Sequence, residues 1–148
     1  MRLNLYKRLL YQKLKRNKLY LIYIPLVVYW IILFTATTLP GGSAPKIAAS
    51  DKLKHFGGYF VLAALLHLTL HFQRKIKKFY KKPLLWTLII TSVYGALDEI
   101  HQLFVPGRNA ELLDWIADIS GALLAVVVTG TIIKSGLLPD KPVRGTKL

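Results

Sequence analysis

The chain has 148 residues, of which 53% are hydrophobic, and its mean hydropathy is +0.40. This composition is too apolar for an ordinary soluble domain of this length, and the absence of cysteine excludes disulfides and thiolate chemistry. The formal net charge of +14 would suit a nucleic-acid-binding protein, but the basic residues occur in blocks between long uncharged runs, which argues against a nucleic-acid partner.

Four apolar runs follow one another along the chain. A helix that crosses a membrane needs about 20 predominantly apolar residues, and in lipid its backbone groups must find partners within the segment. The runs therefore predict helices at about residues 19–39, 53–72, 83–104 and 110–134, in an all-α, four-helix membrane bundle. The first run is longer than the apolar region of a signal peptide, so we expect it to remain as a spanning helix.

The basic residues predict how this bundle is oriented. A membrane domain of residues 19–134 lies between a basic segment, residues 1–18, and a tail, residues 135–148. Seventeen of the 21 lysines and arginines lie in the first 18 residues, in the loop of residues 73–82, or from Lys134 onward. The positive-inside rule therefore predicts a multi-pass protein with both termini and this loop in the cytoplasm, where the basic segments would lie against anionic membrane lipids.

The acidic residues show the opposite distribution, since six of the seven fall at the predicted external end. Asp98 lies 15 residues beyond Pro83, or about 22 Å along its helix, in a hydrocarbon layer about 30 Å thick. Asp118 is equally far from Ile133, and His55 reaches a similar level on the second helix. Ionisable residues within a membrane span usually face the bundle interior and pair with one another, so we expect these helices to meet in one polar layer.

Helical spacing supports this convergence. Asp51, His55 and Tyr59 follow one another at intervals of four residues and share a face of the second helix, and Asp114 and Asp118 share a face of the fourth. We predict a polar pocket open to the outside, with the following ligand-binding residues: Asp51, Lys52, His55, Tyr59, Glu99, Gln102, Arg108, Asp114 and Asp118.

The segment VPGRNA, residues 105–110, connects the third and fourth helices. Pro106 and Gly107 suit the central positions of a type II turn, and Asn109 can cap the fourth helix. A short turn would fix the direction of Arg108, whose guanidinium can grip a carboxylate or a phosphate. Asp98 and Glu99, at the unfavourable C-terminal end of the third helix, need a cationic partner, and the candidates are Arg108, Lys52, Lys54 and His55.

Other features carry less functional information. His67 and His71 have a spacing that can bind a metal, but no carboxylate is predicted at their depth, so we expect interfacial histidines and predict no metal or other cofactor. Four glycines are expected to permit close helix packing, namely Gly57, Gly58, Gly95 and Gly121.

Two stretches resemble the VanZ-like family of small bacterial membrane proteins. They are DKLKHFGGYFVLAALL, residues 51–66, and ALDEIHQLFVPGRNAELLDWIADISGALLA, residues 96–125. The resemblance rests on the patterns D-K-x-x-H-F-x-x-Y, E-x-x-Q-x-F-x-P-G-R and D-x-x-x-D-x-x-G and covers the last three helices, whereas the first helix carries no matching motif. It places the polar signature of the family on Asp51, Lys52, His55, Phe56, Tyr59, Glu99, Gln102, Arg108, Asp114, Asp118 and Gly121. In that family the position of Asp118 is often Asn.

The resemblance implies a protein of the bacterial cell membrane. The family is named for a protein linked to low-level resistance to teicoplanin, a glycopeptide antibiotic with a lipid tail. The resemblance therefore implies that this chain has a role in such resistance.

Three functions are open at this point. The first is binding of an anionic or amphiphilic ligand at the outer leaflet, a lipid headgroup or a lipoglycopeptide, with Arg108 and Lys52 holding its anionic part. The second is an integral-membrane hydrolase or transferase acting on a lipid-linked substrate, with His55, Glu99 and Asp114 as catalytic candidates and a divalent cation as a further option. The third is an ion-coupled carrier. The polar residues could instead form a structural ion-pair network, and four helices of this size could pair as a homodimer.

Overall fold

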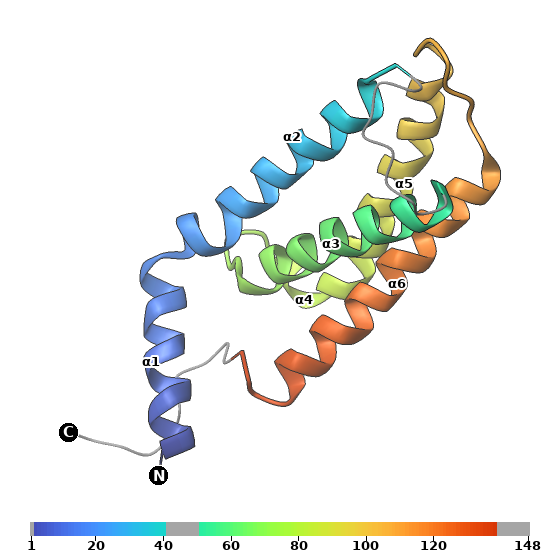
Figure 1. The fold of residues 1–148 in the computed structure, drawn as a ribbon. Coiled ribbons are helices and arrows are strands. Elements are labelled where there is room, and N and C mark those ends of the chain that lie inside the picture. Colours follow the sequence, from blue (N-terminus) through green and yellow to red (C-terminus); the bar gives the residue numbers. More distant parts are fainter. Residues whose placement is uncertain (1, 41–50, 139–148) are drawn as a thin grey trace.

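The computed structural model describes residues 2–40 and 51–138, and every regular element within them is a helix (Figure 1). The elements are α1 Arg2–Arg16, the π-helix η1 Leu19–Tyr23, α2 Ile24–Thr38, α3 Asp51–Phe72, α4 Lys77–Lys81, α5 Pro83–Gln102 and α6 Leu112–Lys134. The all-α prediction is confirmed for these residues, and each of the four predicted long helices begins and ends within two residues of its expected bounds.

Within the described residues, three helical segments are long and apolar enough to cross a membrane, namely Leu19–Thr38, Asp51–Phe72 and Leu112–Lys134. Although α5 has a comparable length, it is not among them, because Asp98 and Glu99 lower the hydropathy of its last turns. The chain is therefore a membrane protein, and α5 carries two buried acids, Asp98 and Glu99, near its C-terminal end.

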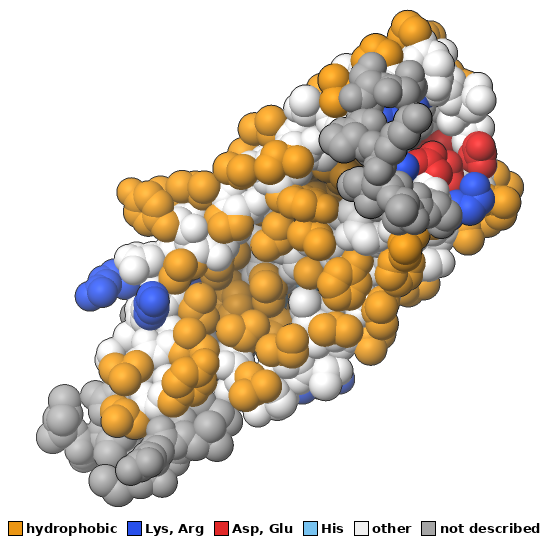
Figure 2. Space-filling view, in the orientation of Figure 1, with side chains coloured by type: hydrophobic (Ala, Val, Ile, Leu, Met, Phe, Trp, Pro, Cys, Tyr) orange, Lys and Arg blue, Asp and Glu red, His pale blue; other side chains and the backbone are white. Residues whose placement is uncertain are grey.

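Apolar side chains cover most of the face seen in Figure 2. Ile31 of α2, Val93 of α5 and Val127 of α6 are 60%, 55% and 61% exposed. Water would disfavour so much exposed apolar surface, whereas lipid chains accept it. Acidic and basic side chains gather together at one end of this face, near the connection between α5 and α6 (Figure 2).

The N-terminal part is more regular than expected. The basic segment of residues 1–18 contains α1, and η1 continues directly into α2. Pro25, in the first turn of α2, has no N–H to donate to the preceding turn, and the wider π-type bond from the Ile24 N–H to the Leu19 carbonyl lies immediately before it.

Helix α3 lies at the centre of the molecule and packs against α6, α5 and α2. The closest approach is at Gly121 of α6, where an added Cβ would lie 2.2 Å from the carbonyl oxygen of Phe56. A Cβ at Gly95 or Gly58 would have its nearest contact at 3.0 or 3.2 Å. Close packing is thus confirmed at these three glycines, but it was wrong for Gly57, which has open space around it.

The side chain of His67 takes part in helix packing, which the sequence did not predict. Its side chain is only 3% exposed, and its Nδ1 hydrogen bonds to the hydroxyl of Thr129 on α6. Because α6 crosses this face of α3 along most of its length, the histidine lies between the two helices.

Candidate functional site

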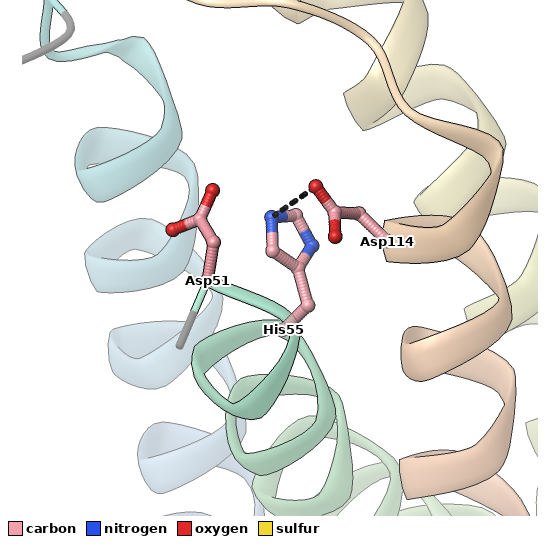
Figure 3. Close-up of side chains that lie close together, drawn as sticks. All are labelled: Asp51, His55 and Asp114. Atoms are coloured by element: carbon pink, nitrogen blue, oxygen red, sulfur yellow. Dashed lines mark ion pairs between the residues drawn. The ribbon is translucent and has the colours of Figure 1, made fainter. Parts of the chain in front are cut away.

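His55 of α3 lies at the centre of a polar cluster to which α5 and α6 contribute carboxylates. Its Nδ1 is 3.0 Å from Oδ1 of Asp118 and 3.8 Å from Oε1 of Glu99. Its Nε2 is 4.0 Å from Oδ2 of Asp114, the ion pair drawn in Figure 3. All four side chains are at least nine-tenths buried. Three helices therefore meet in one polar layer, as helical spacing and depth predicted.

Two glycines allow α3, α5 and α6 to approach one another closely at this layer. Gly121 lets α6 touch the α3 backbone at Phe56, next to His55, and Asp118 lies one turn before Gly121 on α6. On the other side, Gly95 of α5 leaves room for the carboxylate of Asp118, since a Cβ there would lie 3.0 Å from Oδ2. Small residues on two helices thus bring the carboxylate within hydrogen-bond distance of the imidazole.

The start of α3 forms a charged rim over the buried cluster. Lys52 Nζ is 2.8 Å from Oε2 of Glu111 and 3.3 Å from Oδ1 of Asp114, and its side chain is 45% exposed. Lys54 pairs with Asp51 at 3.3 Å, and both are exposed. Figure 3 shows the His55 ring between Asp51 and Asp114. Lys52 thus connects the exposed Glu111 with the buried Asp114.

The start of α6 is capped by a residue of another helix. Oε2 of Glu99 accepts a hydrogen bond of 2.8 Å from the backbone N–H of Glu111, the N-cap position. Asn109 does not cap α6, because the helix begins at Leu112, two residues later than predicted. A carboxylate from α5 therefore satisfies an N–H at the positive end of α6, which also stabilises the charge on Glu99.

Arg108 has a different partner from the one expected. The turn itself is confirmed, because Gly107 has a φ of 73° and the Arg108 N–H donates to the Val105 carbonyl at 3.1 Å. The guanidinium, however, donates to the carbonyls of Leu39 at 3.2 Å and Ala36 at 3.0 Å. Arg108 thus satisfies carbonyls at the negative end of α2 and forms no ion pair with Asp98 or Glu99 within the described residues.

The remaining predicted residues, Tyr59 and Gln102, are buried beside the cluster, 1% and 3% exposed. The Tyr59 hydroxyl and the Gln102 Nε2 have no hydrogen-bond partner in the described part of the chain. Asp98 faces Gln102 and Thr37 of α2. Asp98 and Glu111 were absent from the predicted ligand-binding set, although the sequence already marked both as acids at this end.

Negative charge outweighs positive charge inside the cluster. The buried carboxylates belong to Asp98, Glu99, Asp114 and Asp118. Among the described residues, a lysine pairs with Asp114, but no lysine or arginine pairs with the other three. The arrangement therefore suits groups that donate hydrogen bonds or carry positive charge.

The chain matches the family model described as VanZ/LLP1 over residues 11–133, a range that contains every residue of the cluster. No curated protein and no solved structure matches it.

Proposed function

The chain belongs to the VanZ/LLP1 family, and we propose that it is a multi-pass protein of the bacterial cytoplasmic membrane. In this proposal the Leu19–Thr38 segment, α3, α5 and α6 form a four-helix bundle, and both termini and residues 73–82 are cytoplasmic. The distribution of lysine and arginine supports the orientation. The polar cluster then faces the outer leaflet. Pairing of two copies of the chain as a homodimer also stays a prediction.

We propose that the cluster binds the headgroup of an amphiphile at the outer leaflet, a lipid or a lipoglycopeptide. The observation that carries this proposal is the arrangement of a half-exposed Lys52 above buried carboxylates around His55. The ammonium of Lys52 would attract the anionic part of the headgroup. The carboxylates of Glu99 and Asp114 would accept hydrogen bonds from its hydroxyl or amino groups, which fix its orientation.

In this proposal Arg108 shapes the binding site but does not contact the ligand. Two of its donors are engaged with the end of α2, so it holds α2 and the α5–α6 turn together and thereby shapes the rim. Lys52 is then the principal anion-binding group.

Binding of a lipoglycopeptide would connect the cluster to teicoplanin-type resistance. A protein that retains such an antibiotic at the outer leaflet lowers the concentration that is free to act elsewhere. The same site would retain an anionic lipid when no antibiotic is present.

Native mass spectrometry of the detergent-solubilised chain tests this proposal, with phosphatidylglycerol and teicoplanin as separate probes. The matched pair of variants is Lys52→Gln and Lys54→Gln, neighbouring lysines of which only the first contacts a buried acid. We expect Lys52→Gln to weaken retention of a probe at least about tenfold and Lys54→Gln to leave it unchanged. Equal retention by both variants and wild type would contradict headgroup binding at this cluster.

A second function is favoured by the contact between His55 and Asp118. An imidazole held by a carboxylate at 3.0 Å can act as a general base toward water. An integral-membrane hydrolase acting on a lipid-linked substrate would use His55 in this way, with Glu99 or Asp114 orienting the water. The test is release of phosphate or headgroup from phosphatidylglycerol by the purified chain, with His55→Gln as the inactive control.

A further inference from the structure

Three potential metal ligands converge inside the cluster. They are Nδ1 of His55, Oδ1 of Asp118 and Oε1 of Glu99, with separations from the nitrogen of 3.0 and 3.8 Å. One ligand atom from each of these residues lies within 4.8 Å of the others. Two ligands that are each about 2.0–2.1 Å from a metal ion, at octahedral or tetrahedral angles, are about 2.8–3.4 Å apart. A small shift of Glu99 would therefore complete a three-ligand set.

Unpartnered oxygens of buried carboxylates independently favour cation binding at this cluster. Glu99 Oε1, the atom that faces His55, and Asp118 Oδ2 have no hydrogen-bond partner among the described residues. The two residues are 7% and 1% exposed. An anionic oxygen in such surroundings is strongly unfavourable unless a positive charge or a donor lies beside it.

The local charge balance leads to the same conclusion. No lysine or arginine in the described ranges pairs with Glu99 or Asp118, and His55 is the only basic group in contact with both. A single imidazolium cannot neutralise two carboxylates. A divalent cation bound to neutral His55 and to both carboxylates would bring the local net charge to zero.

A second grouping on the other side of the ring consists of Asp51, His55 and Asp114. Its acids already have cationic partners, because Lys54 pairs with Asp51 and Lys52 with Asp114. This grouping therefore has less need of a metal. Asp114 Oδ2 lies 4.0 Å from Nε2, the other ring nitrogen, where its negative charge would favour a proton on Nε2 and leave Nδ1 free to bind the metal.

We infer that His55, Glu99 and Asp118 bind one divalent transition-metal cation. One imidazole nitrogen and two carboxylate oxygens form a set that suits zinc or manganese, and the remaining coordination positions would be filled by water or by a bound molecule. The inference stands on the contacts of this cluster and does not require that the amphiphile of the proposed function binds.

Metal titration of the purified full chain tests the inference. After chelator treatment, the chain in detergent is titrated with Co²⁺, whose visible absorption reports coordination, and Zn²⁺ is then added to displace it. We expect one Co²⁺ per chain, displaced by one Zn²⁺. Glu99→Gln and Asp118→Asn should each weaken binding at least about tenfold, whereas Asp51→Asn, the matched control from the other grouping, should bind like wild type.

A thermal measurement keeps the test decisive if a variant folds poorly. Stoichiometric Zn²⁺ should raise the Tm of the wild-type chain, and a chelator should reverse the rise. Absence of both stoichiometric binding and a Tm shift would overturn the inference. Loss of binding in Asp51→Asn with full binding in Glu99→Gln would overturn the assignment to these three residues. Neither result depends on whether phosphatidylglycerol or teicoplanin binds.

Discussion

The side chains of His55 and Asp118 meet at 3.0 Å although 63 positions separate them in the sequence. The contact joins α3 to α6, and the same imidazole nitrogen lies 3.8 Å from Oε1 of Glu99 on α5. Among the described residues, no lysine or arginine pairs with Asp118 or Glu99, so the charge balance of these two carboxylates depends on His55.

The first prediction concerns the role of His55 in balancing the charge of the buried carboxylates. His55→Leu should lower the free energy of unfolding by about 3 kcal/mol, because removing one partner of a buried pair leaves the other charge uncompensated. The double variant His55→Leu with Asp118→Leu should lose less than the single one, since an apolar pair needs no compensation. Denaturant titration in detergent with chelator present measures both. A double variant that is less stable than His55→Leu would contradict the pairing.

The second prediction concerns the crossing of α3 and α6. Gly121→Ala should destabilise the protein by about 2 kcal/mol or more, because the new Cβ would lie 2.2 Å from the carbonyl oxygen of Phe56 and must push the helices apart. The matched control is Gly57→Ala, whose Cβ meets nothing within 4 Å. That substitution should be neutral or stabilising, since alanine favours a helix over glycine by about 1 kcal/mol. Thermal unfolding of the two variants provides the comparison.

Periodicity was a sound guide to much of this architecture. The intervals that relate Asp51 to His55, and Asp114 to Asp118, predicted which acids share a helical face, and the depth of Asp98 predicted its burial. Helix bounds followed from the length of each apolar run. These features depend on neighbours along the chain, which the sequence specifies directly.

Partners across the bundle were harder to predict, and Arg108 is the clearest case. Its position in a stiff turn was predicted correctly, but the carbonyls that it satisfies belong to α2, some 70 residues earlier. Whether a guanidinium finds a carboxylate or a helix end depends on how α2 tilts against α5, which has no signature in the local sequence. The burial of His67 escaped prediction for the same reason, because it depends on the path of α6.

The third prediction separates the two roles considered for Arg108. Arg108→Ala should lower the free energy of unfolding by about 1–3 kcal/mol, because two carbonyls of α2 lose their donors. Arg108→Lys should recover part of this loss, since an ammonium can donate to one of them. If Arg108 instead contacts an anionic ligand directly, Arg108→Ala would keep wild-type stability and lose binding of phosphatidylglycerol. Parallel unfolding and native mass spectrometry measurements distinguish these outcomes.

The fourth prediction addresses the polar pair between α3 and α6 outside the cluster. Thr129→Val keeps the shape of the side chain but removes the hydroxyl that contacts His67, so a buried ring nitrogen loses its partner. We expect a loss of about 1–3 kcal/mol in the free energy of unfolding. Co²⁺ binding should be unchanged, because this pair belongs to a different part of the α3–α6 interface. Weakened Co²⁺ binding in a folded Thr129→Val protein would show that the two polar sites are coupled.

The fifth prediction tests the orientation on which an outward-facing cluster depends. The chain has no cysteine, so each introduced thiol is a unique reporter. Phe104 is 80% exposed just after α5, and Lys77 is exposed at the start of α4, at the other end of α5. A membrane-impermeant maleimide should label Phe104→Cys in intact cells and Lys77→Cys only after permeabilisation, because the basic loop is expected to stay in the cytoplasm. The reverse pattern would place His55 and its carboxylates on the cytoplasmic side. In that case a lipoglycopeptide outside the cell could not reach them, whereas the metal site would be unaffected, since it depends only on contacts within the bundle.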